Sequence, residues 1–262
     1  MCAHYKYTRG GLRVAVGISG GWLTTAQETA AIGEYFDKLR DEAPVQRTST
    51  VAGPKAASAS GDNTGSPPAG ELVDIFPGDM AELLIVEDGK RKIVPSKYGL
   101  VPPWVPKGKK KPLVLYNCRD DSLNGGTMKP SFRDPFLRRR GIAAVSVIEE
   151  NMGNHLWLEI RHSLKGQDFF VASIYNYPHE LSDSVTHAFI TTTPNEKIAP
   201  YHDRMPVILG KDEVPIWIDP ETPVPVLLSL LKPCPVEWIG PITERQDEPP
   251  RRKKKQGDLD FD

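Results

Sequence analysis

The residue best suited to covalent chemistry is Cys2, which follows the initiator methionine in "MCAHYKY". Because cysteine is small, we expect Met1 to be trimmed, which leaves a thiol and a free α-amine on one residue. Their reference pKa values of about 8.5 and about 7.7–8.0 leave both groups partly deprotonated near neutral pH. Such a 1,2-aminothiol can condense with an aldehyde to an imine, which the thiolate then closes to a thiazolidine ring. The alternative is that Cys2 is an ordinary residue of a frayed terminus.

Three further motifs carry polar or aromatic groups that could act with Cys2. They are "YGLVPPW" at 98–104, "NCRDD" at 117–121 and "HDRMPVIL" at 202–209. An asparagine amide can accept from an amine and donate to a phosphate, and a histidine can shuttle a proton near neutral pH. Exposed aromatic rings stack on the bases of single-stranded DNA. No pattern has the spacing of metal ligands, so we expect no metal and no cofactor.

The composition describes a protein with an ordinary core and no bulk attraction to nucleic acid. The chain has 262 residues, 39% of them hydrophobic, and a formal net charge of −1. DNA binding must therefore rest on local basic clusters such as "KGKKK" (107–111) and Arg138–Arg140. Salt-sensitive binding with little sequence preference is expected from such clusters.

The three cysteines form no CxxC pair, which favours a reducing compartment over a disulfide scaffold. The sequence shows no signal peptide and no apolar run of membrane-spanning length. We therefore expect an intracellular protein without a membrane partner. Its place would be the cytoplasm or nucleoid of a bacterium, or the nucleus of a eukaryote.

Short strands separated by turns must position these residues. The patterns predict a predominantly β member of the α+β class, with a curved mixed or antiparallel sheet, or a barrel-like one, and a few peripheral helices. Glu87-Asp88-Gly89 is expected to form a hairpin turn. Strands are expected at 2–7, 13–16, 81–86, 91–94, 141–150, 155–161, 168–176 and 187–193, and helices at 24–43 and 224–231.

The same patterns predict one domain over residues 2–232, present as a monomer. The Ser/Gly/Ala/Pro-rich segment 47–71 is expected to be a disordered surface loop, and residues 243–262 a flexible charged tail. Residues 256–261 within "QGDLDFD" resemble short peptides that bind the replication sliding clamp. The alternative for this segment is a plain acidic tail.

Taken together and in this order, the motifs resemble the SRAP (SOS-response-associated peptidase) family. The family typically reads MCGR, WGL-x-P-x-W, NARSE, a stretch ending in F-Y-E-W, and H-x-R-M-P. The resemblance implies a protein that binds single-stranded DNA and shields abasic sites as a covalent protein–DNA crosslink. It also implies that the α-amine of Cys2 attacks the deoxyribose aldehyde and that its thiolate closes the thiazolidine.

The resemblance also assigns roles to three other residues. Asn117 would orient Cys2, and His202 would assist ring opening and contact a phosphate. Setting Arg139-Arg140-Gly141-Ile142 on the family's R-R-C-L brings Glu150 onto the glutamate of F-Y-E-W, an acid and base that needs a pKa raised by burial. Because neighbouring residues of a strand point to opposite faces, only one of Glu149 and Glu150 can face the site.

Contacts with DNA are implied for His4, Tyr98, Trp104, Arg119, Arg140 and Arg204. Alternatives remain open at three of these positions. Tyr98 and Trp104 could pack in the core, and Arg204 could form an internal salt bridge. His4 stands where the family has the arginine of MCGR, and Tyr98 stands where it has the tryptophan of WGL.

Two other functions compete with covalent capture. A thiol peptidase could pair Cys2 with His202, with the self-removal of Met1 as its most plausible reaction. A non-catalytic DNA-binding module would keep its affinity after Cys2→Ala. Because an imine activates the sugar, a crosslinking protein could also show abasic-site lyase activity.

Overall fold

The computed structural model describes residues 4–9, 72–104, 113–123 and 128–247. Its strands are β1 (His4–Thr8), β2 (Leu72–Ile75), β3 (Met80–Glu87), β4 (Lys90–Tyr98), β5 (Asn117–Arg119), β6 (Arg140–Val145), β7 (Val147–Gly153), β8 (Leu156–Ile160), β9 (Phe169–Asn176), β10 (Thr186–Thr192), β11 (Met205–Pro206), β12 (Ile208–Leu209) and β13 (Thr243–Gln246). Its helices are α3 (Pro130–Arg138), α4 (Glu213–Ile218) and α5 (Val224–Ser229), with 3-10 turns at Asp120–Ser122 and Val236–Trp238. Cys2 and the segments 13–16, 24–43 and 47–71 lie outside the described residues.

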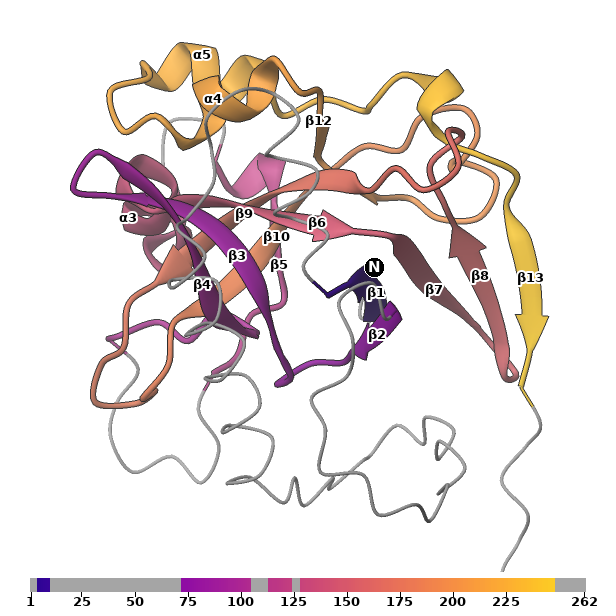
Figure 1. Ribbon diagram of the computed structural model, residues 1–262, viewed down its shortest axis with the longest axis horizontal. Helices are drawn as coiled ribbons and strands as arrows, with labels where there is room; N and C mark the ends of the chain where they lie inside the picture. The colour runs from indigo at the N-terminus through magenta and orange to yellow at the C-terminus, as the bar shows by residue number, and fades with distance from the viewer. Residues whose placement is uncertain (1–3, 10–71, 105–112, 124–127, 248–262) are drawn as a thin grey trace, which may run out of the picture.

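The first sheet has five strands in the order β13-β8-β7-β1-β2, and all of its pairs are antiparallel. Strand β1 therefore lies between β2 and β7, with His4 opposite Glu149 and Tyr5 opposite Ile148. In Figure 1, β7, β8 and β13 stand side by side, with the N-terminal strand next to them. This arrangement places the start of the chain against β7.

The second sheet has the order β11-β10-β4-β3-β6-β9-β12, with β5 added beside β10. Strand β9 also pairs with β10, so β10, β4, β3, β6 and β9 close into a ring. Strands β4 and β5 run parallel to β10, and the other pairs are antiparallel. The expected fold class, a predominantly β member of the α+β class with a curved mixed sheet and few helices, is confirmed.

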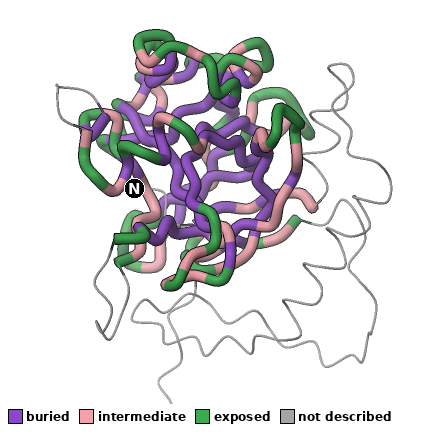
Figure 2. Tube along the Cα trace, turned by 90° about the vertical axis from the view of Figure 1, so that its left-hand side faces the viewer, coloured by how far each residue is buried: buried purple, intermediate pink, exposed green. Residues whose placement is uncertain are grey.

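Alternate residues of the ring strands face two separate cores. In β6, Ile142 and Ala144 belong to the core that packs against α3 and α4, whereas Ala143 and Val145 belong to the core shared with the first sheet. Both faces of these strands are thus buried, and Figure 2 shows the buried backbone concentrated in the middle of the molecule. Such double burial explains why β6 and β9 are apolar along most of their length.

The chain crosses from the ring to the first sheet at Ser146. Its hydroxyl accepts a hydrogen bond from the backbone N–H of Thr8 at 2.9 Å, and its own N–H donates to the Lys6 carbonyl at 2.8 Å. The single strand predicted at 141–150 is therefore two strands, β6 and β7, in different sheets. Because of this crossing, Glu149 and Glu150 lie on β7, beside β1, and not in the ring.

Several local predictions are confirmed, and one boundary differs. Asp88 and Gly89 take positive φ angles of 51° and 70° in the turn between β3 and β4, as the expected hairpin requires. Helix α5 lies within the range predicted at 224–231. Thr243–Gln246, which were expected to belong to the flexible tail, instead pair with β8 as β13. Among the described residues, no helix is both long and apolar enough to cross a bilayer.

Candidate functional site

Strand β7 carries two adjacent glutamates to opposite faces of the first sheet. Glu149 lies opposite His4 and Glu150 lies opposite Leu158. The Glu150 side chain enters a small pocket shared with the "HDRMP" segment. Its lining residues are Ile148, Glu150, Ile160, Ile198, Arg204, Met205, Pro206, Ile208 and Ile239.

Burial is the main influence on the Glu150 carboxyl, which is 4% exposed. Removal from water raises the pKa of Glu150 above its usual value, and positive charge at His202 opposes that rise. A carboxyl in such a pocket can hold a proton closer to neutral pH than a solvated one. Glu150 therefore has the property expected of a general acid.

The "HDRMP" segment is tied to the "NCRDD" segment by an ion pair. Arg204 Nη2 lies 2.7 Å from Asp120 Oδ1 and also donates to the Thr191 carbonyl. His202 Nδ1 accepts a hydrogen bond from the Arg204 backbone N–H at 3.0 Å. The Arg204 guanidinium is thus bound by acceptors inside the protein, which agrees with the internal salt bridge given as the alternative for this residue. The phosphate contact expected of Arg204 does not fit this arrangement.

Strand β5 separates Asn117 and Arg119, which share one face, from Cys118, which is buried in the core. Asn117 lies beside Phe189 and Arg119 beside Thr191 in the parallel pairing with β10. The Arg119 side chain is 46% exposed and lies 2.8 Å from Asp121. Of the arginines expected to contact DNA, Arg119 is the one with its guanidinium at the surface.

The residues of "YGLVPPW" divide between core and surface. Tyr98 is completely buried, packed edge-on against Tyr5, whereas Trp104 is 54% exposed. Gly99 has a φ of +126°, and a Cβ there would lie 2.5 Å from a Val114 methyl. Tyr98 therefore packs in the core, and its burial prevents the DNA contact expected of it. Trp104 does not pack in the core, and its exposed ring could stack on a base.

Arg140 is buried and cannot serve as the DNA contact expected from the sequence. Its guanidinium donates to the backbone carbonyls of Phe136, Leu137, Trp217 and Asp219 at 2.6–2.9 Å. Those carbonyls lie at the C-terminal ends of α3 and α4, where backbone acceptors lack partners within the helix. Arg140 thus joins two helices to β6.

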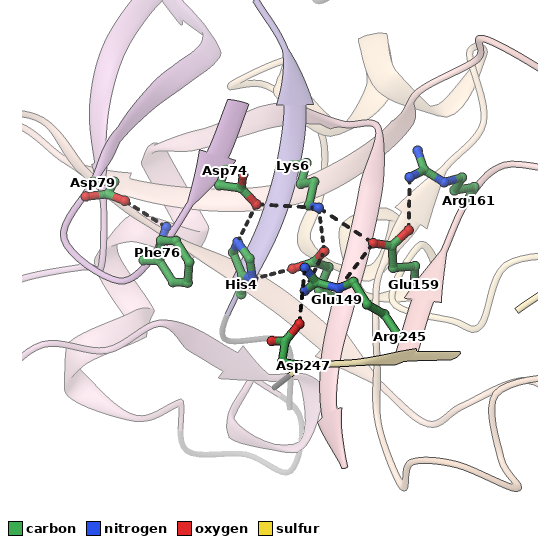
Figure 3. Close-up of polar contacts among 10 residues, drawn as sticks. All are labelled: His4, Lys6, Asp74, Phe76, Asp79, Glu149, Glu159, Arg161, Arg245 and Asp247. Atoms are coloured by element: carbon green, nitrogen blue, oxygen red, sulfur yellow. Dashed lines mark hydrogen bonds and ion pairs between the residues drawn. The ribbon is translucent and has the colours of Figure 1, made fainter. Parts of the chain in front are cut away.

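His4 also lies inside the protein rather than on a DNA-facing surface. Its ring stacks on Phe76 at a centroid distance of 3.9 Å, and its two nitrogens face Asp74 and Glu149. Figure 3 shows this ion-pair row, which continues through Lys6, Glu159 and Arg245. We call these six residues, His4, Lys6, Asp74, Glu149, Glu159 and Arg245, the Glu149 row.

The Glu149 row was missed by motif-based reasoning. The alternation of His4 and Lys6 on one face of β1 was its only local signal. His4, Asp74 and Glu149 bring ligand atoms within 4.8 Å of one another, a spacing that could hold a metal ion. However, Lys6 Nζ lies 2.9 Å from Glu149 Oε1 and already supplies positive charge there. The arrangement is therefore better described as an ion-pair network.

The two described cysteines are poor nucleophiles. Cys118 and Cys234 are both buried, and burial raises the pKa of both thiols, that of Cys234 to about 12. Neither can supply a thiolate near neutral pH.

A second, larger pocket is lined by His162, Asp168, Lys211 and Trp238 among others. Apart from Ile208 and Leu209, none of its lining residues belongs to the motifs predicted to carry chemistry.

The model of the family described as "SOS response associated peptidase (SRAP)" matches residues 45–242 of the chain. The chain belongs to the SRAP family. The matched range contains Asn117, Glu150 and His202, whereas Cys2 and His4 precede it. Membership confirms the resemblance inferred from the order of the motifs.

Two curated relatives support the assignment to SRAP. "Abasic site processing protein YoaM" of Bacillus subtilis is 34% identical over 158 residues, which are 58% of this chain and 68% of the relative. "Abasic site processing protein YoqW" of the same bacterium is 35% identical over 159 residues, 58% of this chain and 69% of the relative. The same protein name occurs in Bacillus phage SPbeta with the same identity.

Solved structures show the same fold. A protein from Bacteroides thetaiotaomicron superposes with a TM-score of 0.60 at 22% identity and covers 91% of this chain and 90% of its own. A protein from Bordetella bronchiseptica gives a TM-score of 0.53 at 17% identity, with 69% of this chain and 88% of its own covered. At these identities the likeness concerns the fold alone.

Proposed function

We propose that this chain binds single-stranded DNA and captures abasic sites covalently through Cys2. The observation that carries the proposal is the position of Glu150, a buried carboxyl one residue from the register partner of His4. Relatives named abasic site processing proteins point to the same substrate class. Abasic deoxyribose offers the aldehyde that an N-terminal aminothiol would capture.

The reach of the chain is compatible with this role. Cys2 lies outside the described residues, but it precedes His4 by two residues, which span at most about 7 Å. Glu150 follows Glu149, the residue that pairs with His4. The α-amine of a trimmed chain can therefore reach the mouth of the Glu150 pocket. Cys118 and Cys234 are buried, so the proposed nucleophile falls to Cys2.

The chemistry divides into ring opening, imine formation and ring closure. Protonated Glu150 donates to the ring oxygen O4′ of the closed sugar as the C1′–O4′ bond breaks, and the C1′ hydroxyl gives up its proton to water, which leaves the aldehyde at C1′. The α-amine of Cys2 adds to C1′, and loss of one water gives an imine. The Cys2 sulfur then attacks C1′, and the nitrogen takes up a proton. The product is a thiazolidine, and the balance is aldehyde plus aminothiol to thiazolidine plus water.

Neighbouring residues would hold the DNA and assist proton transfer. His202, which interacts electrostatically with Glu150, can relay protons between Glu150 and the sugar. Asn117 would orient the amine, Arg119 would pair with a phosphate, and Trp104 would stack on a base beside the lesion. Attachment to a sliding clamp through residues 256–261 stays a prediction, because that segment lies outside the described residues.

The test uses Met-free protein, verified by mass spectrometry, and a single-stranded oligonucleotide with one abasic site. We expect a heat-stable adduct on a denaturing gel that Cys2→Ala abolishes and that Cys118→Ser, a change at a buried thiol, leaves in place. Adducts formed by protein that retains Met1 would contradict the proposed nucleophile. Cleavage of an unrelated labelled peptide without adduct formation would instead favour the peptidase.

A further inference from the structure

The Glu149 row crosses one face of the first sheet from strand to strand. Asp74 comes from β2, His4 and Lys6 from β1, Glu149 from β7, Glu159 from β8 and Arg245 from β13. Figure 3 shows these side chains directed toward one another across the strands, with Asp247 at the edge. Their burial deepens toward the middle, where the Glu149 side chain has no exposed surface.

Glu149 is the point at which the cations of the row meet. Its carboxylate pairs with His4 Nδ1, lies 2.9 Å from Lys6 Nζ and lies 3.4 Å from Arg245 Nη2. Two of these three cations belong to β1. A buried carboxylate with no exposed surface must keep such partners, because an unpaired charge is costly away from water.

The opposite face of β1 is held by apolar packing. Tyr5 and Tyr7 point into the core shared with the ring, where Tyr5 packs against Tyr98 and Phe189. That packing fixes the depth of the strand. The ion pairs of His4 and Lys6 with Glu149 fix its position along β7, because a slip of one residue would separate both cations from the carboxylate.

We propose that Glu149 is a positioning residue for Cys2, which it places beside Glu150 by holding His4 and Lys6 of β1 in register. The inference rests on the proposed function, since it concerns the geometry of the same nucleophile. Cys2 precedes His4 by only two residues, which span at most about 7 Å, so the position of His4 limits where the amine can lie. Glu150 belongs to the same strand as Glu149, so a shift of β1 along β7 changes the distance between Cys2 and Glu150.

The charge on His4 makes the pairing of β1 with Glu149 dependent on pH. Burial by itself would lower the pKa of His4, but hydrogen bonds to Asp74 and Glu149 outweigh it and raise the pKa above its ordinary value of 6.5. The ion pairs of His4 with Asp74 and Glu149 are thus fully formed below about pH 6.5 and are lost as pH rises through the raised pKa of His4, whereas Lys6 keeps its pair with Glu149. The charged groups around His4 are Lys6, Asp74, Glu149, Glu159, Arg245 and Asp247.

The experiment measures the rate constant and the final yield of adduct with excess protein over abasic single-stranded DNA. Glu149→Gln is compared with Glu87→Gln, the same change at an ion-paired glutamate of the remote β3–β4 hairpin. We expect Glu149→Gln to lower the rate constant by about 10²-fold, the effect of an ångström-scale misplacement. The yield and the affinity for undamaged single-stranded DNA should match wild type. Glu87→Gln should behave as wild type in all three.

A second variant, His4→Arg, keeps the positive charge toward Asp74 and Glu149 and can stack on Phe76. Since arginine does not titrate in this range, the ratio of the wild-type rate to the His4→Arg rate should fall as pH rises through the His4 pKa. A ratio that does not change with pH would overturn the proposed role of His4 in holding β1 in register.

Two results would overturn the role of Glu149. One is a wild-type rate constant for Glu149→Gln. The other is a reduced yield with an unchanged rate constant, because that pattern means only that part of the protein is unfolded. If wild-type protein itself forms no adduct, the proposed function is refuted and the positioning role falls with it.

Discussion

The ion pair between Asp120 and Arg204 joins two motifs that lie far apart in the sequence, and we predict that its removal reduces stability rather than DNA affinity. Asp120 Oδ1 accepts from Arg204 at 2.7 Å, and Oδ2 accepts from the Thr192 hydroxyl at 2.8 Å. The Thr192 hydroxyl also lies 3.3 Å from the Leu231 carbonyl. Asp120→Asn therefore removes the charge while the Thr192 hydroxyl can turn to accept from the new amide.

The size of the effect follows from burial. The side chains of Arg204 and Asp120 are 7% and 16% exposed, so the pair is largely removed from water. Removing one partner of a buried pair costs about 3–5 kcal/mol. Because the amide keeps a hydrogen bond and Asp120 is partly solvated, we expect about 2–3 kcal/mol. For a domain of this size that decrease lowers the melting temperature by about 4–12 °C.

Urea unfolding of Asp120→Asn, Arg204→Met and the double variant gives the coupling energy of the pair. The affinity for single-stranded DNA is measured in parallel at several salt concentrations. If Arg204 paired with a DNA phosphate, Arg204→Met would reduce the slope of log K against log salt by about 0.7. We expect an unchanged slope. A reduced slope together with wild-type stability would refute the internal role of Arg204 and restore its predicted place in the DNA interface.

Four other changes test the site and the fold. Glu150→Gln should slow adduct formation by about 10²–10⁴-fold on denaturing gels, as removal of a general acid requires, and a wild-type rate would show that the assigned acid is wrong. Trp104→Ala should weaken binding to single-stranded DNA by about 1–3 kcal/mol in a titration, with an unchanged melting temperature because the ring is exposed. Gly99→Ala should destabilise the protein by about 2–4 kcal/mol in thermal melts, since its φ is positive and the new methyl meets Val114; a near-neutral change would contradict that contact. The pKa of Glu149 is lowered, because ion pairs with His4 and Lys6 outweigh the opposite effect of burial. Its contribution to stability is therefore present above its ordinary value of 4.5 and lost as pH falls below it, so Glu149→Gln should flatten the acid side of a stability–pH curve.

Elements specified by local sequence could be predicted. The Glu87-Asp88-Gly89 turn is defined by residues that accept positive φ, and the strands on either side of it follow. The break at Ser146 could not be predicted, because "GIAAVSVIEE" is apolar throughout its first eight residues apart from one serine. The partners that divide it, Thr8 and Lys6, are more than a hundred residues away.

The predicted site residues divide in the same way. Glu150 is buried, and Arg119 and Trp104 are exposed, so their predicted roles stay predictions, whereas Arg140 and Arg204 are held by internal acceptors. An arginine in a basic run reads as a surface residue unless its acceptors are known. Those acceptors are carbonyls and a carboxylate supplied by other elements of the fold, and no local pattern announces them.

Because Glu149 and Glu150 point to opposite faces of the sheet, the number of residues that precede them in β7 decides which carboxylate lies on which face. Removal of a single residue between Ser146 and Glu149 would turn every following side chain of the strand through half a turn and exchange the two carboxylates. Glu150, the proposed proton donor, would then lie among three cations, and Glu149 would take its place on the other face. Natural variants of this segment should therefore show very few insertions or deletions.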